Sequence, residues 1–320
     1  MKNLYLDGLM GLAVGDAVGV PCEFRSRAQM AAEPVWDMTG FGSHWQMPGT
    51  WSDDTSMALC TADSLAKGGF DAADMMRRFA AWKNEAAYTA GGQVFDVGCT
   101  CSAAIRRFEQ GIRPEGCGDD SVLGNGNGAL MRILPASLWR LKTADCENMP
   151  FETFIAPVHG AAALTHAHAR GLICCGIYTM IVHAIITRGE EETLMQAVCR
   201  GWERACEGYA AMGSRFAGEL GEFIHPQTLK QMPMDEIGSG GYAVETLHAA
   251  LRCLLETRSY ADCVIMAVNL GGDTDTTAAV AGGLAGLVYG AEGIPQRWRD
   301  TLRRREMIEE IAHRLQQAVS

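Results

Sequence analysis

The arrangement of apolar and polar residues along the chain is helical almost throughout. In residues 71–85, for example, apolar side chains recur among charged ones at the spacing of an amphipathic surface helix. No segment alternates β-branched and polar residues over the length of a strand, so we expect no sheet. The pattern predicts helices over residues 4–18, 71–85, 99–111, 129–141, 161–188, 191–209, 243–256, 261–270, 274–289 and 297–319.

Four stretches between these helices are predicted to be loops, several of them rich in glycine: residues 33–50, 115–128, 149–157 and 225–241. None has the composition of a flexible linker, and the sequence contains no internal repeat or low-complexity segment. A chain of 320 residues can form one large domain or two smaller ones. We therefore predict an all-α fold in which residues 1–320 form a single compact helical domain.

Two polar clusters each stand at the head of a helix made of small apolar residues. Asp53 and Asp54 lie in TWSDDT at residues 50–55, and Asp273 and Asp275 lie in GGDTDTT at residues 271–277. Carboxylates at the mouth of a buried helix are costly unless something pairs with them. Four of them together would require a strong positive charge, and oxygen ligands select a hard cation such as Mg²⁺ or Mn²⁺. If the clusters meet, we expect a two-metal site.

The alternative is that each cluster only caps its helix. Asp and Thr are common N-caps, and acidic residues in a first turn suit the helix dipole. Capping is a sufficient explanation for either cluster alone. Two clusters of the same composition, each opening a small-residue helix, favour the metal site.

Composition narrows the class of protein. Hydrophobic residues make up 48% of the chain, enough for a substantial core, and the net charge is −11 with no basic run, so no nucleic-acid surface is expected. The 12 cysteines include no Cys-x-x-Cys and lie mostly in apolar helical stretches, as free thiols in a reducing compartment do. Asp7 and Asp16 interrupt the apolar N-terminus, and residues 172–186 form too short an apolar run to span a bilayer comfortably. We expect a cytoplasmic protein with no membrane span.

Three further carboxylates stand in positions of interest. Asp16 lies inside an apolar helix, where a salt bridge or a helix-end contact is the simplest explanation. Pro21 ends that helix and puts Glu23 on a loop, where it is either a solvated charge or a candidate general base. Asp96 immediately precedes a predicted helix, so it is either an N-cap or a carboxylate that binds a cationic substrate group.

Two more stretches are candidates for substrate binding. A glycine-rich loop runs into a helix start and consists of Gly124, Asn125, Gly126, Asn127 and Gly128. Backbone N–H groups in such a loop favour phosphate, although a simple turn is the alternative because the lysine and preceding strand of a Walker A motif are missing. His166 and His168 are two residues apart in a predicted helix and so point in different directions. One of them can face a site while the other packs or is exposed, and a packed core histidine is the alternative for each.

In their order along the chain, these stretches resemble the ADP-ribosylglycohydrolase family. Its members share Gly-Asp-x-x-Gly with a glutamate seven residues after the aspartate, Thr-Asp-Asp-Thr, Gly-Asn-Gly followed by Met-Arg, Thr-His, and Gly-Gly-Asp-x-Asp-Thr. The ordered set spans residue 8 to about residue 290 and is specific, although each motif alone is modest. The matching residues are Asp16, Gly19 and Glu23, Ser52 to Thr55, Gly126 to Gly128 with Met131 and Arg132, Thr165 and His166, and Gly271 to Thr276. The stretch FDVG at residues 95–98 looks most like the bacterial branch typified by dinitrogenase reductase-activating glycohydrolase, which removes ADP-ribose from arginine.

The resemblance implies an all-α fold, two Mg²⁺ or Mn²⁺ ions and hydrolysis of the N-glycosidic bond between ADP-ribose and a protein arginine. Carried over by position, the metal ligands are Ser52, Asp53, Asp54, Asp273, Asp275 and Thr276. Ser52 departs from the family's usual threonine but keeps the hydroxyl. The resemblance further implies that Asp54 or Glu23 takes the proton of the attacking water, that the loop of residues 124–128 holds the pyrophosphate, and that His166 contacts the substrate.

Two alternatives remain at this point. The first is hydrolysis of another linkage, in which ADP-ribose is attached to serine, acetate or nucleic acid. The second is a non-catalytic relative that binds ADP-ribose, which the oxygen side chains at every expected ligand position disfavour. The expected partners are therefore an arginine-ADP-ribosylated protein and ADP-ribose itself.

Overall fold

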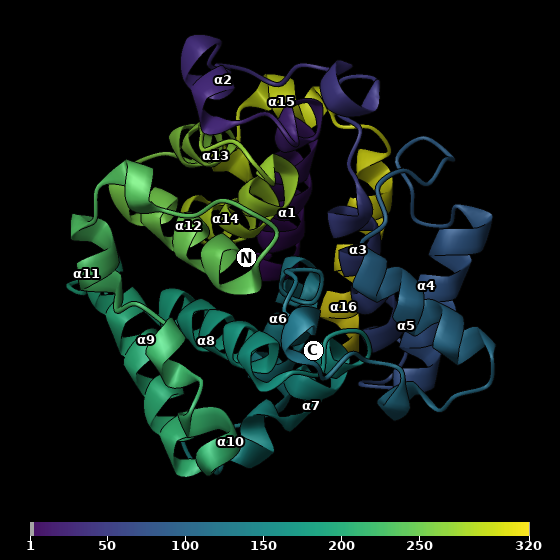
Figure 1. The fold of residues 1–320 in the computed structure, drawn as a ribbon, viewed down its shortest axis with the longest axis vertical. Helices are drawn as coiled ribbons and strands as arrows, with labels where there is room; N and C mark the ends of the chain where they lie inside the picture. Colours follow the sequence, from purple (N-terminus) through teal and green to yellow (C-terminus); the bar gives the residue numbers. More distant parts are fainter. Residues whose placement is uncertain (1–2, 320) are drawn as a thin grey trace.

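The computed structural model describes residues 3–319, and its regular elements there are all helices (Figure 1). No strand forms within these residues, where β-type pairing is limited to three isolated bridges. The all-α prediction is confirmed. The α-helices are α1 (Leu4–Gly19), α2 (Arg27–Ala32), α3 (Asp53–Leu65), α4 (Ala72–Glu85), α5 (Cys99–Glu109), α6 (Leu134–Thr143), α7 (Phe151–Ala163), α8 (Ala169–Ile186), α9 (Leu194–Ala211), α10 (Ser214–Ala217), α11 (Pro226–Gln231), α12 (Ala243–Glu256), α13 (Tyr260–Asn269), α14 (Thr274–Tyr289), α15 (Gln296–Thr301) and α16 (Arg305–Ala318).

The centre of the fold is the antiparallel pair α1 and α14, whose backbones touch. A Cβ atom at Gly11 would lie 2.3 Å from the carbonyl oxygen of Gly282, and one at Gly15 would lie 2.1 Å from that of Ala278. Tyr260 reinforces the contact by donating from its hydroxyl to the carbonyl oxygen of Gly11 at 2.6 Å. Because the helices are antiparallel, the C-terminal end of α1 lies beside the N-terminal end of α14.

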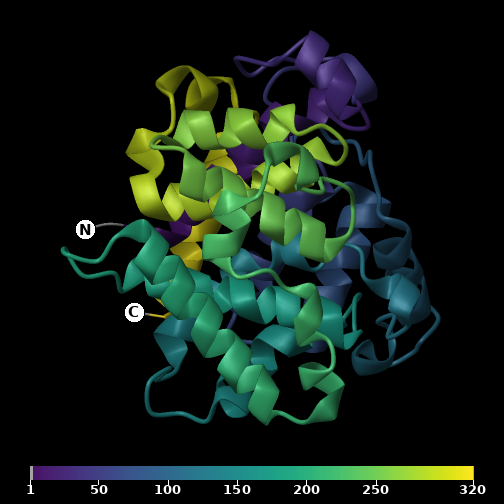
Figure 2. The same ribbon diagram turned by 60° about the vertical axis from the view of Figure 1, so that its left-hand side comes forward.

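The other helices pack around this pair in groups. In Figure 1, α12 and α13 lie near α14, whereas α3, α4 and α5 gather on the other side of the molecule. Figure 2 shows α8 and α9 running side by side, with the backbones close at Gly201, where a Cβ atom would lie 2.6 Å from the carbonyl oxygen of Met180. One continuous apolar core links all these groups, as a single domain requires.

The loop predicted over residues 149–157 is wrong, because α7 begins at Phe151 and contains Pro157. A proline inside a helix leaves the carbonyl four residues earlier without its usual donor. Here that carbonyl belongs to Thr153, and Arg140 donates to it at 3.0 Å and to the next carbonyl, of Phe154, at 2.7 Å. The side chain of Arg140 thus replaces the missing N–H and allows the helix to pass through the proline.

The single helix predicted over residues 161–188 is two helices. α7 ends at Ala163, and α8 begins at Ala169 with His168 as its N-cap. The segment between them pairs with a distant loop, where Asp119 N–H donates to Thr165 O at 2.9 Å and Ala167 N–H donates to Asp119 O at 2.8 Å. His166 therefore lies on a loop, contrary to the prediction.

The single closing helix predicted over residues 297–319 is also interrupted. α15 ends at Thr301 and α16 begins at Arg305, with Arg304 in the left-handed region at φ 47°. Arg303 N–H donates to the carbonyl oxygen of Gly49 at 3.0 Å, and Arg304 donates to that of Thr89 at 3.2 Å. These long-range hydrogen bonds turn the chain at Arg304. The sequence has no glycine or proline there that would indicate the break.

Two helical stretches are apolar and long enough to cross a membrane by length and composition alone. They are Leu4–Cys22, which includes α1, and Ala169–Ile186, which is α8. In the structure, 89% and 83% of these two apolar stretches, respectively, are buried inside the protein. Both serve as core helices in this fold.

Candidate active site and metal centre

The two polar clusters of the sequence meet at the junction of α1, α3 and α14. Asp16 of α1, Asp54 of α3 and Asp275 of α14 each offer a carboxylate oxygen within 4.8 Å of the other two. Glu23, Asp273 and Asp275 form a second group with the same spacing, so Asp275 belongs to both. The N-terminal ends of α3 and α14 both carry members of these groups, and their helix dipoles favour negative charge there.

Asp16 is the carboxylate that fixes the start of α3. Its Oδ1 accepts from Ser52 N–H at 2.9 Å, and its Oδ2 accepts from the N–H of Thr55 at 3.0 Å and from its hydroxyl at 2.6 Å. Asp16 thus caps α3 in place of the Ser52 side chain, whose hydroxyl lies 2.8 Å from Asp54 Oδ2. Burial raises the pKa of Asp16 to about 6, although these hydrogen bonds lower it. The structure therefore has the helix-end contact considered for this residue.

Three buried carboxylate oxygens of the cluster have no hydrogen-bond partner among the described residues: Asp54 Oδ1, Asp273 Oδ1 and Asp275 Oδ2. The pKa of Asp54 is raised well above its usual range, mainly by burial and secondly by repulsion from Asp16. The pKa of Asp275 is likewise raised, mainly by burial and secondly by repulsion from Asp54. Within residues 3–319, no lysine or arginine forms an ion pair with these carboxylates. Buried anionic oxygens that lack a cation are the donor set that hard divalent cations prefer.

Asp53 and Thr276, both predicted as ligands, border the cluster on the pocket side. Asp53 lies outside both three-carboxylate groups and accepts a backbone hydrogen bond from Gly98. Burial and then repulsion from Asp96 raise the pKa of Asp53 well above its usual range. Thr276 donates from its hydroxyl to Asp54 Oδ2 at 3.3 Å.

Glu23 follows α1 on a loop, as predicted, yet it is buried at 5% exposure, so the solvated-charge alternative is wrong. Its carboxylate pairs with His44 Nε2, and the His44 ring lies between Phe24 and Phe95, with ring centroids 5.8 and 5.2 Å away. Burial raises the pKa of Glu23 to about 7, while the hydrogen bond from His44 lowers it. A carboxyl group with this pKa can exchange a proton near neutral pH.

Asp96 does not cap α5, because the N-cap of that helix is Gly98 and no side chain caps it. Asp96 instead adopts φ 49° and lies with Glu23 and His44, each offering an atom within 4.8 Å of the others. Burial raises the pKa of Asp96, and the nearby His44 lowers it. The capping alternative is therefore wrong, and the carboxylate lines the pocket.

The glycine-rich loop of residues 124–128 borders the pocket with only part of its length. Gly126, Asn127 and Gly128 line the pocket, whereas Gly124 and Asn125 do not. Two of its backbone N–H groups are already used, since Gly124 donates to Ser121 O at 2.9 Å and Asn127 donates to Gly241 O at 3.0 Å. The Asn127 side chain donates to Asp273 Oδ2 at 2.8 Å, which ties this loop to the carboxylate cluster.

His166 is buried and lines the pocket from the loop between α7 and α8. Arg132 donates to Thr165 Oγ1 at 2.7 Å, and that oxygen shares a hydrogen bond of 2.8 Å with His166 Nδ1. Burial and then Arg132 lower the pKa of His166 to about 3, so the ring is neutral near pH 7.

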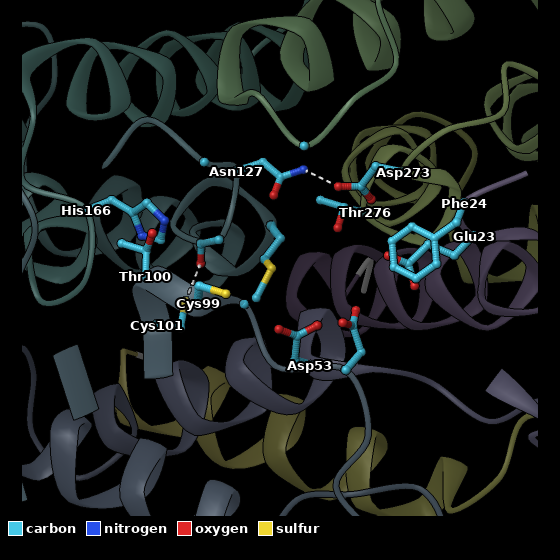
Figure 3. Close-up of a pocket in the computed structure, with 16 residues that line it drawn as sticks. Glu23, Phe24, Asp53, Cys99, Thr100, Cys101, Asn127, His166, Asp273 and Thr276 are labelled. Atoms are coloured by element: carbon cyan, nitrogen blue, oxygen red, sulfur yellow. Dashed lines mark hydrogen bonds between the residues drawn. The ribbon is translucent and has the colours of Figure 1, made fainter. Parts of the chain in front are cut away.

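Carboxylates line the pocket on two sides, and His166 lines its end. Figure 3 shows Asp53 and Asp273 facing one another across it, with Glu23 and Phe24 on one side and His166 and Thr100 on the other. Sequence reasoning did not assign the lining residues Phe24, Cys99, Thr100, Cys101 and Gly241 to the site, and it reached Gly98 and Met131 only as members of family motifs. Proximity to Asp96 and to the glycine-rich loop was the only signal in the sequence for most of them.

Comparisons with known proteins agree with the resemblance seen in the motifs. The model of the ADP-ribosylglycohydrolase family matches residues 1–320. The ADP-ribosyl-dinitrogen reductase glycohydrolase of Rhodospirillum rubrum is 35% identical over 303 residues, which are 93% of this chain and 89% of that protein. ADP-ribosylarginine hydrolase Tri1 of Pseudomonas putida is 32% identical over 310 residues, 96% of this chain and 76% of that protein.

More distant relatives include the human ADP-ribosylhydrolase ARH3, which is 27% identical over 336 residues, 92% of this chain and 87% of that protein. A solved structure described as an ADP-ribosylglycohydrolase-related protein complex has a TM-score of 0.77 and 31% identity, and it covers 99% of this chain and 98% of its own. The fold, the site and the full-length match agree. This chain belongs to the ADP-ribosylglycohydrolase family.

Proposed function

We propose that this protein hydrolyses the N-glycosidic bond between ADP-ribose and a protein arginine, reversing mono-ADP-ribosylation. Two relatives at 32% and 35% identity carry names that describe release of ADP-ribose from arginine and from dinitrogen reductase. The name of the human relative leaves the linkage open. The observation that carries the proposal is a pocket lined by Asp273, which has an unpaired carboxylate oxygen, together with the carboxylates of Glu23 and Asp96.

We propose two Mg²⁺ or Mn²⁺ ions as cofactors, held by Ser52, Asp53, Asp54, Asp273, Asp275 and Thr276. The donor set supports this ligand assignment, because three of these carboxylates have a buried oxygen with no partner in the described chain and the two carboxylate groups share Asp275. Such ions would supply Lewis-acid binding of the ribose hydroxyls and would lower the pKa of a bound water. Asp16 holds the start of α3 in place and is a positioning residue.

Glu23 is the better candidate than Asp54 for the general base. Both carboxylates are buried, but only Glu23 lines the pocket, and the Thr276 hydroxyl already donates to Asp54. Glu23 takes the proton of the attacking water, and His44 holds its carboxylate toward the pocket. The bond to the ribose breaks through an oxocarbenium-like state, whose positive charge the surrounding carboxylates stabilise.

The remaining residues bind the two ends of the substrate. Asp96 accepts hydrogen bonds from the arginine guanidinium, which is planar and cationic and matches a carboxylate. The pyrophosphate lies against Gly126 and Gly128, where the absence of side chains allows close approach to the backbone. His166 contacts the substrate from the wall of the pocket.

The test is release of free ADP-ribose from arginine-linked, serine-linked and nucleic-acid-linked substrates and from O-acetyl-ADP-ribose, with and without Mg²⁺ or Mn²⁺. We expect release from the arginine-linked substrate that depends on the metal. Faster release from another linkage would replace the arginine assignment while keeping the family chemistry. No release from any substrate would identify a binding protein without catalysis.

A further inference from the structure

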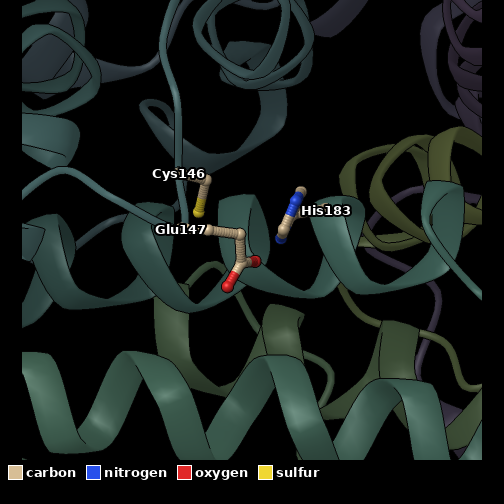
Figure 4. A group of neighbouring side chains, drawn as sticks. All are labelled: Cys146, Glu147 and His183. Carbon is tan, nitrogen blue, oxygen red and sulfur yellow. The ribbon is translucent and has the colours of Figure 1, made fainter.

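A second group of metal-binding side chains lies away from the pocket, between α6 and α7. Cys146 and Glu147 follow α6 in the connecting loop, and His183 lies in the last turn of α8. The Cys146 Sγ, a Glu147 carboxylate oxygen and a His183 ring nitrogen each lie within 4.8 Å of the other two. Figure 4 shows the three side chains gathered beside α8.

These groups form a mixed sulfur, nitrogen and oxygen donor set. The Cys146 thiol is buried at 7% exposure, and neither it nor the His183 ring makes a hydrogen bond within the described part of the chain. Burial lowers the pKa of His183, which keeps the imidazole neutral and able to bind a metal. Burial raises the pKa of the Cys146 thiol, so a metal must displace its proton.

Neighbouring residues hold this group in place. Arg204 of α9 donates to Glu147 Oε1 at 2.6 Å and also to the carbonyl oxygen of Cys146. The bond to Arg204 uses Oε1 and leaves Oε2 of the same carboxylate for a metal, and metal-binding carboxylates commonly have such an outer partner. The exposed position of Glu147 leaves a further coordination position open to solvent.

We propose that Cys146, Glu147 and His183 bind one Zn²⁺-type transition-metal ion, with solvent as the fourth ligand. Zn²⁺ binds thiolate, imidazole and carboxylate at about 2.0–2.3 Å in a tetrahedron, whose edges are roughly 3.6 Å. Small side-chain rotations bring the three atoms to that spacing. The ion fastens the loop between α6 and α7 to α8 and is chemically distinct from the oxygen-only cluster of the pocket, which suits harder cations.

The experiment titrates Co²⁺, a spectroscopic substitute for Zn²⁺, into the full-length protein in excess Mg²⁺. A thiolate-to-cobalt charge-transfer band arises only where a cysteine binds the metal, so the oxygen-only cluster cannot produce it. We expect one Co²⁺ per chain with this band, its loss on adding Zn²⁺, and its absence in Cys146→Ser. Cys206→Ser, which removes a partly buried thiol elsewhere on α9, is the matched control and should keep the band.

A second variant and a folding check make the result decisive. His183→Gln should weaken Co²⁺ binding at least about tenfold, the lower end of what losing even an outer-shell contact costs. Metal-free melting curves and circular dichroism verify that each variant is folded. The proposal is overturned if folded wild-type protein gives no band at millimolar Co²⁺. It is equally overturned if the band survives Cys146→Ser and disappears in Cys99→Ser, because the exposed thiol at the pocket would then be the ligand.

Discussion

Asp275 is the carboxylate shared by both groups at the junction of α1, α3 and α14, and one of its oxygens is buried without a partner. Asp275→Asn keeps the shape of the side chain and removes a charge that two ions would share. We expect kcat/KM at saturating Mg²⁺ to fall by orders of magnitude, while the metal-free variant melts no lower than wild type because one repelling charge is gone. Activity assays and melting curves in a chelator measure the two effects.

The matched control for this change is Asp300→Asn, at an exposed aspartate far along the chain on α15. It should leave activity unchanged and lower the free energy of unfolding by at most about 1 kcal/mol, because its ion pair with Arg305 is exposed. Near-normal turnover in a folded Asp275→Asn variant would contradict the two-metal assignment. A large loss of metal-free stability would instead mean that the carboxylate is a structural partner rather than an unpaired ligand.

We propose Asp96 as the residue on which the choice of linkage depends. Asp96→Asn removes the charge that a guanidinium would bind, and a charge-assisted hydrogen bond contributes roughly 1.5–3 kcal/mol, or about ten- to a hundredfold in rate. We expect that loss on arginine-linked substrate and no loss on any serine-linked activity. The measurement is kcat/KM of wild type and variant on both linkages.

The structure sharpens how this experiment is interpreted, because α5 is not capped by Asp96. Unchanged activity on both linkages would mean that the carboxylate only borders the pocket. Equal loss of activity on both linkages would mean that Asp96 acts on the ribose or on the metals. An effect on the metals would pass through the neighbouring Asp53, whose pKa Asp96 raises. Only a selective loss supports the guanidinium role.

At the scale of elements, the contact between α1 and α14 determines where the carboxylates lie. Gly15→Ala would place a methyl group 2.1 Å from the carbonyl oxygen of Ala278, and neither backbone can yield without moving a helix. Overpacking of this kind costs about 1–3 kcal/mol. We expect that loss in denaturant unfolding, together with reduced activity, since α14 carries Asp273 and Asp275 at its start.

The control is Gly221→Ala, where an added Cβ meets no heavy atom within 4 Å. It should change stability by no more than about 0.5 kcal/mol. If the two alanine variants had the same free energy of unfolding, the backbones of α1 and α14 would have room for an added methyl group, and the prediction would be wrong.

A histidine in the contact between α7 and α9 predicts acid sensitivity. His159 is stacked on Tyr209 and Phe216, with its Nε2 2.7 Å from the Tyr209 hydroxyl, and burial lowers its pKa to about 3. Because an unfolded histidine titrates near 6.5, the stability due to this neutral ring is present above that pH and is lost as pH falls below it. Between pH 7 and pH 5 the loss is about 2 kcal/mol.

Denaturant unfolding at pH 7 and pH 5 tests this for wild type and His159→Gln. The variant lacks the titrating ring, so its stability should fall by about 2 kcal/mol less over the same interval. Equal losses in the two proteins would show that the imidazole is protonated in the folded state.

The sequence indicated most helices because each segment's own pattern determines them. The stretches 243–256 and 274–289 were predicted at the bounds that α12 and α14 have. The errors lie where distant residues decide the local structure. Backbone hydrogen bonds with Asp119 keep the segment around Thr165 out of a helix. The side chain of Arg140 allows Pro157 within a helix. A hydrogen bond to the carbonyl oxygen of Gly49 turns the chain at Arg303.

The same distinction applies to the site. Acidic residues are unusual at the start of a buried helix, so the sequence alone could identify Asp53, Asp54, Asp273 and Asp275. His44, which pairs with Glu23 across 21 positions, ends a short 3-10 helix (Gly42–His44) in a segment predicted to be a loop and has no such signal. Contacts of this kind depend on the packing of loops and cannot be inferred from spacing along the chain.

For the whole molecule, the fold brings buried carboxylates together in a chain whose net charge is already −11. Divalent ions that bind only the folded state should therefore stabilise it by mass action, by about 2.7 kcal/mol at a hundred times the dissociation constant. We expect the melting temperature to rise by roughly 4 °C on adding Mn²⁺ at that concentration to chelator-treated protein. Asp275→Asn should lose most of this shift.

Sodium chloride at the same ionic strength separates specific binding from general screening. At about 0.1 M salt the Debye length is near 10 Å, so exposed charges are screened, but buried ones much less. The carboxylates of Asp16, Asp54 and Asp275 are at most 1% exposed, so sodium chloride should relieve little of their repulsion. If it raised the melting temperature as much as Mn²⁺ does, the stabilisation would come from surface charge, and the cluster would be buried acid without a metal. A shift that Mn²⁺ alone produces, and that Asp275→Asn removes, assigns the stabilisation to ions at the junction of α1, α3 and α14.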